Sequence, residues 1–517
     1  MPVVASSEPR ASRDSCRSRI AETLQQILQR NLDTSNGPPL VAFQALNPSA
    51  LAQAEALDRA TSAQQPKGPL HCMPIAVKAN FAITDLPMTV GSLSLVGNQP
   101  IAEGVLLRRL REAGAIVIGT TTMDEFAVGI SGISGTAGRV GNAINPWLTP
   151  GGSSSGSGVA VGAGLVPLAA GSDNCGSLRL PAVYNGAVSL RPSLGRFPSD
   201  GMFPLGETNG TPGLIAHDLR TLNNGLGVMA PQWQTSQSQQ AAALVGRRIG
   251  VLTRAGAQSL EPTTTEARRL LNRGITLLRA AGAVVEEKLV IHGFHTNLGR
   301  DLTRGGVPAI DQHLASYPAA RRSWADICQS GRIPPEWTPT SCQTMLRADP
   351  PAQRRAQRAM ESNRGLIEAL LKRRQLDALL LLPDRQGGAQ SQPSDVITCF
   401  VSGYSGVPAV VLPIGLDNRG LPVGVELLGA YGTDEALMAM ATHLETQRGA
   451  LSMQAAHTPA NTPLTLTIPQ HNNAVVTIGW RSWLSRKGSD PGDLEPARFR
   501  RLTEAVVREQ AYLAAYR

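Results

Sequence analysis

The sequence predicts an α/β fold in which helices cover both faces of a large, mixed and twisted β-sheet. From about Gly68 onward, short apolar runs typical of buried strands alternate with stretches of helical periodicity. Hydrophobic residues make up 42% of the 517 residues and charged residues only 17%, which is enough apolar material for a sizeable core. The 52 glycines and 37 prolines favour many turns over long helical bundles.

The first expected element is an amphipathic helix, because Ile20, Leu24, Ile27 and Leu28 recur at helical spacing. The periodicity of the following segments predicts strands at 74–77 and 115–118 with a helix at 105–113 between them. The small, apolar segment 159–165 is typical of a helix packed closely on a sheet. Toward the end, strands are expected at 376–382, 407–413 and 421–428, and a helix at 433–447.

These elements divide the chain into three parts. Residues 1–67 form an N-terminal helical segment of one large domain, residues 68–449 its core, and residues 450–517 a C-terminal accessory extension. Within the extension, 458–473 is rich in Pro, Thr and Asn and is typical of a linker, while a strand is expected at 474–478 and a helix at 495–516. The polar stretch 232–240 predicts a surface loop.

Charge and apolar patterning exclude two classes of partner. The net charge of +9 comes from scattered arginines, with no long basic run and few aromatic residues to stack on bases, so no nucleic-acid partner is expected. Residues 1–19 lack the apolar segment of a secretory signal, and the longest apolar runs are too short to cross a bilayer. We therefore expect a cytoplasmic protein without a membrane partner.

The six cysteines are widely spaced and none belongs to a C-x-x-C pair. This pattern indicates neither a zinc site nor a disulfide scaffold, so reduced thiols are expected.

The densest chemical signal is the Gly/Ser-rich run 151–158, for which several interpretations compete. A flexible linker is disfavoured by Asn145-Pro146-Trp147 before it and the apolar helix after it. A phosphate-binding loop is disfavoured because no G-x-x-x-x-G-K-[ST] motif is present. Gly152–Gly156 also matches the G-x-S-x-G nucleophile elbow, which would make Ser154 the nucleophile, but the strand required upstream is missing.

Two further motifs accompany this run. One is Met73-Pro74-Ile75-Ala76-Val77-Lys78-Ala79-Asn80, in which a lysine ends an apolar strand in a chain with only five lysines. The other is Gly171-Ser172-Asp173-Asn174-Cys175-Gly176-Ser177-Leu178-Arg179-Leu180-Pro181-Ala182. Together with Asn145–Ser157, and with supporting similarity at 119–129 and 406–429, they resemble the amidase signature family. The resemblance covers residues 15–447.

The resemblance implies a Ser-cisSer-Lys triad. It assigns Ser177 as the nucleophile, Ser153 as the bridging serine on a cis Gly152–Ser153 peptide, and Lys78 as the base. It also places the oxyanion between the backbone N–H groups of 174–177, that is Asn174, Cys175, Gly176 and Ser177, and lines the substrate pocket with Ala127 and the 129–131 segment. Lysine can act as a base when burial lowers its pKa. No metal or organic cofactor is required.

The sequence departs from the family pattern at two positions. Lys78-Ala79-Asn80 stands where the family usually has Lys-Asp-Asn, which affects the support of the site rather than its chemistry. Cys175 replaces a glycine and is expected to narrow the acyl pocket; it lacks the adjacent base that a nucleophile of its own would need. Asp173 and Arg179 are expected to brace the loop, with a substrate-carboxylate clamp as the alternative role for Arg179.

The leading hypothesis is an amidohydrolase that cleaves an acyl C–N bond other than a peptide bond. Carboxamides, aryl or alkyl amides, carbamates (as in a urethanase) and acyl-ureas all fit. One alternative is the glutaminase (A) subunit of a tRNA-dependent amidotransferase, and another is a non-enzymatic binding protein on the same fold. The expected partner is a small-molecule amide-type substrate, and a homodimer is the assembly considered.

Overall fold

The computed structural model describes residues 15–449 except for 34–36, 61–66, 207, 231, 234–241, 304–305, 318–320, 335–336, 348 and 391–395. The accessory extension 450–517 and most of the loop 232–240 therefore lie outside the described residues. No helix in the described part of the chain is long and apolar enough to span a membrane.

The architecture is organised by a mixed sheet of 12 strands. Strand β2 pairs in parallel with β3 and β6, whereas β8, β7, β13 and β14 follow as an antiparallel series. In sheet order the strands are β1 (Phe43–Leu46), β3 (Ile116–Thr121), β2 (Pro74–Lys78), β6 (Leu168–Asp173), β8 (Thr211–Ala216), β7 (Val188–Arg191), β13 (Ala409–Leu416), β14 (Pro422–Leu428), β12 (Ala378–Leu381), β9 (Arg248–Ala255) and β10 (Gln258–Ser259), with β11 (Val284–Ile291) paired to β9.

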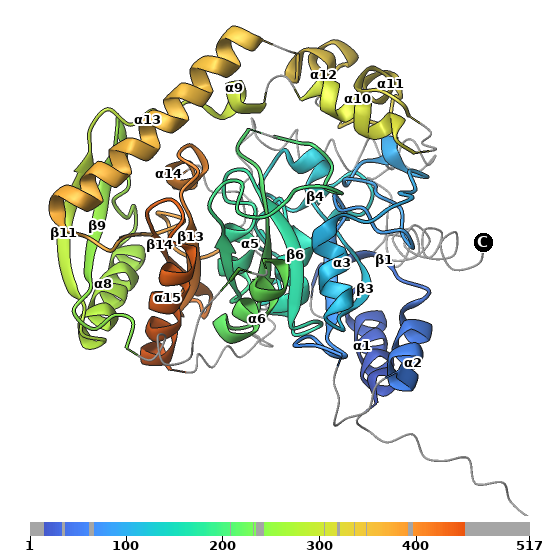
Figure 1. Ribbon diagram of the computed structural model, residues 1–517, viewed down its shortest axis with the longest axis horizontal. Coiled ribbons are helices and arrows are strands. Elements are labelled where there is room, and N and C mark those ends of the chain that lie inside the picture. The colour runs from blue at the N-terminus through green and yellow to red at the C-terminus, as the bar shows by residue number, and fades with distance from the viewer. Residues whose placement is uncertain are drawn as a thin grey trace, which may run out of the picture.

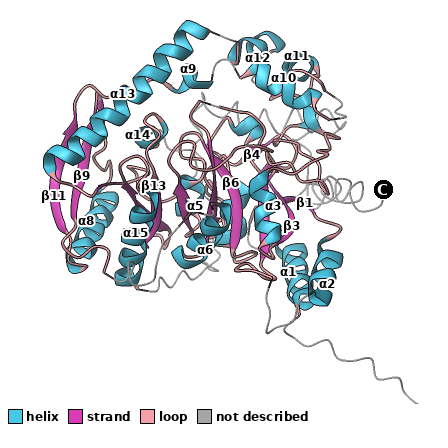
Figure 2. Ribbon diagram, in the orientation of Figure 1, coloured by secondary structure: helices cyan, strands magenta, loops and turns pink. Residues whose placement is uncertain are grey.

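Helices cover both faces of this sheet, as expected (Figures 1 and 2). Successive residues of a strand point to opposite faces, and in β2 Ile75 and Val77 join one apolar cluster while Ala76 joins the other. The first cluster includes α3 (Val105–Glu112), α6 (Leu219–Met229), α8 (Thr265–Ala280) and α15 (Asp434–Arg448). The second includes α1 (Cys16–Arg30), α2 (Ala50–Ala60), α4 (Ser155–Gly162) and α5 (Arg179–Tyr184).

A further layer of helices arches over one end of the sheet (Figure 1). The long helix α13 (Pro350–Arg374) packs on β9, β11 and β12. A separate apolar cluster joins Trp324 and Phe126 to the small helices beside them. The remaining described elements are α9 (Gly299–Thr303), α10 (Val307–Ala315), α11 (Trp324–Gln329), α12 (Pro339–Met345), α14 (Phe400–Gly403), the one-turn helices η1 (Leu93–Leu95) and η2 (Glu125–Ala127), and the hairpin of β4 (Ile133–Ser134) and β5 (Gly138–Arg139).

Every strand and helix expected in the described residues is present, with shifted ends. The helix expected at 159–165 begins at Ser155, because the Gly/Ser run forms its first turns. Residues 1–67, expected to be helical, also supply β1, which pairs antiparallel with β3 at the sheet edge. Strands β6, β7 and β8 and the elements between β8 and β12 were among those not anticipated.

The expectation of reduced cysteines is wrong. The disulfides Cys16–Cys72, Cys175–Cys399 and Cys328–Cys342 account for all six cysteines of the chain. Two of these bonds join residues separated by 56 and 224 positions. Pairing at such separations is set by the tertiary fold, so it leaves no local spacing signal in the sequence.

Truncating a buried side chain in a central strand should destabilise the protein far more than truncating an exposed side chain on a helix. Leu412 of β13 is fully buried, whereas Leu28 of α1 is 71% exposed. Leu412→Ala should lower the free energy of unfolding by about 2–5 kcal/mol, because it leaves a cavity in the core. Leu28→Ala should change it by less than about 0.5 kcal/mol. Denaturant titrations followed by circular dichroism measure both, and equal shifts would contradict the assigned core.

Candidate active site

The site is built around a lysine that the fold removes entirely from solvent. Strand β2 is buried along its whole length and Lys78 is its last residue, with 0% of its surface exposed. The Lys78 Nζ lies 2.9 Å from Ser153 Oγ and 3.1 Å from Ser172 Oγ. Asn80 Nδ2 donates a hydrogen bond to the same Ser172 hydroxyl at 3.1 Å. The amine is therefore fixed between two serine hydroxyls from neighbouring segments.

Burial also sets the charge of this amine. Desolvation lowers the pKa of Lys78 to about 7, although the nearby Asp124 and Asp173 carboxylates act in the opposite direction. A substantial fraction of Lys78 is therefore neutral near pH 7, when its lone pair can accept a proton. An ordinary surface lysine would be almost fully protonated at the same pH.

Ser153 lies in the backbone turn that enters α4, and the Gly152–Ser153 peptide is cis, as the family resemblance implies. The other serines of this run have structural partners. Ser154 Oγ donates to the Ser172 carbonyl at 3.2 Å, and Ser157 Oγ donates to the Ala170 carbonyl at 3.0 Å. Ser153 thus differs from its neighbours in having the lysine amine as its hydrogen-bond partner.

Asp124 connects this turn to the segment that follows η2. Its carboxylate accepts hydrogen bonds from the Ser131 N–H at 2.9 Å and from the Gly132 N–H at 3.1 Å, while its own N–H donates to the Ser153 carbonyl at 3.2 Å. A Cβ on Gly152 would lie 2.2 Å from Asp124 Oδ1, so only glycine fits beside this carboxylate. Burial raises the pKa of Asp124 to about 6.

Ser177 lies in the turn between β6 and α5, with 6% of its surface exposed. The Ser154 N–H donates to the Ser177 carbonyl at 3.2 Å, which brings the two predicted serine segments together. The hydroxyls of Ser153 and Ser177 are not hydrogen-bonded to each other. Such contacts often tighten only when substrate is bound, so the arrangement is compatible with a proton relay.

The Asp173 carboxylate organises the turn that carries Ser177. It accepts hydrogen bonds from the Gly176 N–H at 2.9 Å and from the Leu178 N–H at 3.0 Å. Burial would raise the pKa of Asp173, but the charges of Arg179 and Arg191 outweigh it and hold that pKa well below its usual range. Asp173 is therefore a buried anion around which the turn is folded.

Arg179 braces this turn and does not reach the place where substrate would bind. Its Nε donates to Asp173 Oδ2 at 3.1 Å and its Nη1 to Glu426 Oε1 at 2.7 Å, and the side chain is fully buried. The bracing role expected for Asp173 and Arg179 fits these contacts. The alternative role of Arg179 as a substrate clamp does not, because Arg179 is absent from the lining of the cavity described below.

The four N–H groups expected to hold an oxyanion are not equivalent. The Gly176 N–H is already bonded to Asp173. No described residue accepts a hydrogen bond from the N–H of Asn174, Cys175 or Ser177, so these three donors remain available to a ligand. The Asn174 side chain is held in place by donating to the Leu205 carbonyl at 3.1 Å.

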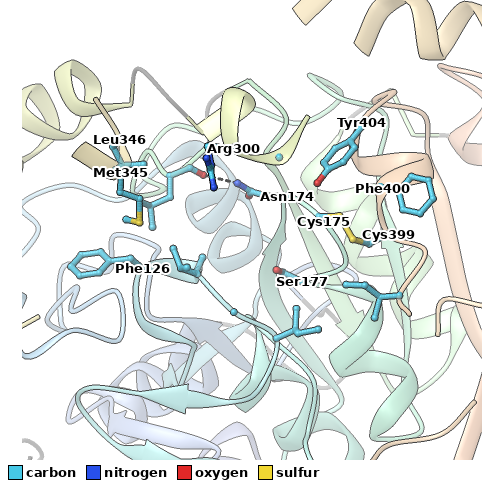
Figure 3. Close-up of a pocket in the computed structure, with 18 of the residues that line it drawn as sticks. Phe126, Asn174, Cys175, Ser177, Arg300, Met345, Leu346, Cys399, Phe400 and Tyr404 are labelled. Atoms are coloured by element: carbon cyan, nitrogen blue, oxygen red, sulfur yellow. Dashed lines mark hydrogen bonds between the residues drawn. A yellow bond between two sulfur atoms is a disulfide. The ribbon is translucent and has the colours of Figure 1, made fainter. Parts of the chain in front are cut away.

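A cavity of about 920 Å³ opens in front of Ser177, and its lining is mainly apolar (Figure 3). Ala127, Gly129 and Ile130 lie in its wall, whereas the predicted lining residue Ser131 does not. Lys78 and Ser153 are not among the lining residues. The lining residues are Phe126, Ala127, Val128, Gly129, Ile130, Asn174, Cys175, Ser177, Leu205, Gly206, Thr296, Gly299, Arg300, Thr344, Met345, Leu346, Ile397, Cys399, Phe400 and Tyr404.

Several of these residues were not anticipated from the sequence. Arg300, Met345 and Leu346 come from the segment of α9 to α12, and Cys399, Phe400 and Tyr404 come from around α14. None of them lies in a motif with a chemical signature. Ser172 and Asp124 were also missed as partners of the site, although both lie inside stretches that resemble the family.

One group of potential metal ligands exists in the described residues, and it lies outside this cavity. The ligand atoms of Cys16, His71 and Cys72 lie within 4.8 Å of one another. The two sulfurs are joined in a disulfide, so they are not thiolates that could bind a metal.

Comparisons with known proteins agree with this architecture. The family model described as Amidase matches residues 26–438. The chain is 32% identical to mandelamide hydrolase from Pseudomonas putida, over 78% of this chain and 83% of that protein. It is 29% identical to the A subunit of glutamyl-tRNA(Gln) amidotransferase from Synechococcus sp. (strain RCC307), over 86% of this chain and 95% of that protein.

Among solved structures, native peptide amidase from Stenotrophomonas maltophilia matches with a TM-score of 0.74 and 28% identity, over 84% of this chain and 94% of that one. These matches in sequence and in fold extend across nearly all of the described residues. The chain therefore belongs to the amidase family, the amidase-signature hydrolases that act on C–N bonds.

Proposed function

We propose that this protein hydrolyses the C–N bond of a small linear carboxamide with a bulky apolar acyl group, through an acyl-enzyme on Ser177. The observation that carries the proposal is the buried Lys78 amine, with its pKa lowered to about 7, at 2.9 Å from Ser153 Oγ. The mainly apolar cavity in front of Ser177 supports the acyl preference. A relative named mandelamide hydrolase supports an amide as the substrate class.

In the proposed mechanism, neutral Lys78 accepts a proton from Ser153, which accepts one from Ser177. The Ser177 Oγ attacks the carbonyl carbon, and the oxyanion is stabilised by the N–H groups of Asn174, Cys175 and Ser177. Ser153 then donates a proton to the leaving nitrogen and the C–N bond breaks. Water hydrolyses the resulting ester by the same relay, which requires neither a metal nor a cofactor.

The glutaminase subunit of a tRNA-dependent amidotransferase is the second candidate, because 29% identity extends over 86% of the chain. The mainly apolar cavity fits the polar side chain of glutamine less well than an apolar acyl group. Hydrolysis of glutamine that appears only after partner subunits are added would favour this second function. We propose no nucleic-acid partner for the free-standing amidase.

A substrate panel tests the acyl preference. Purified enzyme should hydrolyse phenylacetamide with a kcat/KM at least about tenfold above that for acetamide, because the phenyl group buries apolar surface in the cavity. Anilides, carbamates and acyl-ureas complete the panel, and released amine is the readout. Equal efficiency for acetamide and phenylacetamide would contradict an apolar acyl site.

Ser177→Ala should abolish turnover, because the acyl-enzyme cannot form without its hydroxyl. Ser154→Ala is the matched control: its hydroxyl bonds only the backbone of Ser172, donating to the carbonyl and accepting weakly from the N–H, so most of the activity should remain. A fluorophosphonate probe should label Ser177 in the wild type and in the control, as read by peptide mass spectrometry. A Ser177→Ala rate above about one tenth of wild type, or labelling at Ser154, would contradict the assignment.

The rate should depend on pH through Lys78. Because only the neutral amine accepts a proton, kcat/KM should be low at about pH 5, rise through about pH 7 and level off near pH 9. Lys78→Met removes the base at similar volume and should lower kcat by at least about 10²-fold. Lys67→Met, at an exposed position, should leave the profile unchanged. A wild-type rate that is flat across this range would argue against a lysine base.

A further inference from the structure

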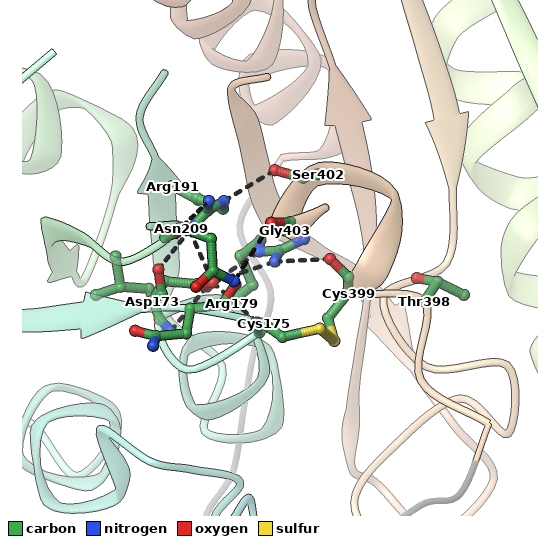
Figure 4. Close-up of a disulfide and its surroundings, with 12 residues drawn as sticks. Asp173, Cys175, Arg179, Arg191, Asn209, Thr398, Cys399, Ser402 and Gly403 are labelled. Carbon is green, nitrogen blue, oxygen red and sulfur yellow. Dashed lines mark hydrogen bonds and ion pairs between the residues drawn. A yellow bond between two sulfur atoms is a disulfide. The ribbon is translucent and has the colours of Figure 1, made fainter. Parts of the chain in front are cut away.

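The turn that carries Ser177 is covalently tied to a distant part of the chain. Cys175 lies in this turn, and its disulfide partner Cys399 is the N-cap residue of α14, 224 positions away in the sequence. Figure 4 shows the bond crossing between the two segments. Their Cα atoms lie 4.9 Å apart. Among the described residues it is the one covalent cross-link that reaches the cavity wall.

Hydrogen bonds to neighbouring backbone carbonyls run beside this disulfide. Asn209 Nδ2 donates to the Asn174 carbonyl at 3.1 Å and, more weakly, to the Gly403 carbonyl at 3.4 Å. Arg179 Nη2 donates to the Cys399 carbonyl at 3.3 Å. Figure 4 shows these groups around the bond. The two segments also touch directly, since a Cβ on Gly403 would lie 2.7 Å from the Asn174 carbonyl oxygen.

The Asp173 carboxylate holds only the part of the turn that follows Cys175. It binds the N–H groups of Gly176 and Leu178, but not that of Cys175. Gly176, directly after Cys175, has a positive φ of 90° that favours glycine and leaves the chain free to adopt other conformations if it is released. The Cys175 N–H, one of the proposed oxyanion donors, shares a planar peptide unit with the Asn174 carbonyl that Asn209 holds, and the disulfide adds a covalent restraint at the Cys175 side chain.

We propose that the Cys175–Cys399 disulfide is a positioning element that sets the oxyanion donors of the Ser177 turn, so that catalysis depends on its oxidation state. This inference rests on the proposed function, because it assumes that Ser177 forms the acyl-enzyme. Hydrogen-bond donors must be held within about 0.5 Å of their productive positions to stabilise a developing oxyanion. Loosening one side of the turn therefore lowers kcat more than it changes substrate binding.

Both sulfur-bearing residues line the cavity, so a small dithiol can reach the bond (Figure 3). Reduction by a dithiol proceeds by two thiol–disulfide exchanges. A reagent thiolate first attacks one protein sulfur and forms a mixed disulfide, and the other protein sulfur leaves and is protonated to a thiol. The second thiolate of the reagent then closes the ring by displacing the protein sulfur from the mixed disulfide. The products are two protein thiols and the cyclic disulfide of the reagent. The other four cysteines are buried and lie outside the cavity lining.

The experiment compares oxidised and dithiothreitol-treated enzyme, with thiols at each position counted by mass spectrometry. Once Cys175 and Cys399 are reduced, kcat for the best amide should fall at least about tenfold with KM changed less than about threefold. Oxidised glutathione should restore kcat. Circular dichroism is recorded before and after treatment. An unchanged spectrum shows that the fall in kcat does not come from unfolding.

Paired variants separate this bond from the other two. Cys175→Ser/Cys399→Ser should have the low kcat of the reduced enzyme and gain no further sensitivity to dithiothreitol. Cys16→Ser/Cys72→Ser, which removes a bond outside the cavity lining, should keep the wild-type kcat and the wild-type sensitivity. Unchanged kcat with both thiols free would overturn the proposal. A rise in KM alone would also overturn it, because the disulfide would then be only a pocket wall.

The failure of the proposed function would look different. Oxidised wild-type enzyme that neither hydrolyses any amide nor reacts with a fluorophosphonate at Ser177 would refute the amidase mechanism, whereas active oxidised enzyme that is insensitive to reduction refutes only the role of the disulfide. Cytosolic thiol systems keep such bonds reduced. An enzyme that depends on this bond reaches full activity in an oxidising compartment, which is at odds with the cytoplasmic location expected from the sequence.

Discussion

Removal of the Lys78 amine from water is the constraint on which the rest of the site depends. A charged ammonium in an apolar strand is unfavourable unless it is neutralised or paired. Within the described part of the chain no carboxylate lies at ion-pair distance; serine hydroxyls lie beside the amine, and Asp124 and Asp173 act on it only from farther away. The balance of burial against these two charges leaves the lysine close to half-protonated near neutral pH, which a proton relay requires.

The two carboxylates have separate structural tasks. Asp124 fastens the segment around Ser131 to the turn of Ser153, and Asp173 folds the turn of Ser177 around itself. The pKa of Asp173 is lowered because two arginines outweigh its burial, whereas burial raises that of Asp124, where backbone and hydroxyl donors and the distant Lys78 amine offset it only in part. Asp124 thus provides a buried carboxylate near the lysine in a chain whose Ala79 replaces the family's usual aspartate.

The features of the fold and site that depend on neighbouring residues in the sequence were predictable from the sequence. The strand that ends at Lys78 was predictable because it is a continuous apolar run, and the family motifs singled out Ser153, Ser177 and Ala127, of which Ser177 and Ala127 line the cavity. The far wall of the cavity was not predictable, because Met345, Phe400 and Tyr404 reach it only through tertiary packing. The same reason explains the missed disulfide, since nothing in the sequence near Cys175 indicates a partner 224 positions away.

The replacement of a family glycine by Cys175 then has a structural explanation. A glycine at this position leaves the turn to be held by hydrogen bonds alone. A cysteine bonded to Cys399 adds a covalent restraint and places sulfur in the cavity wall. The Asp173 carboxylate holds the N–H groups of Gly176 and Leu178 and the disulfide holds the side chain of Cys175, so adjacent residues of this short turn are restrained before any substrate arrives. Preorganised donors need no rearrangement as negative charge develops, which is the physical basis of oxyanion stabilisation.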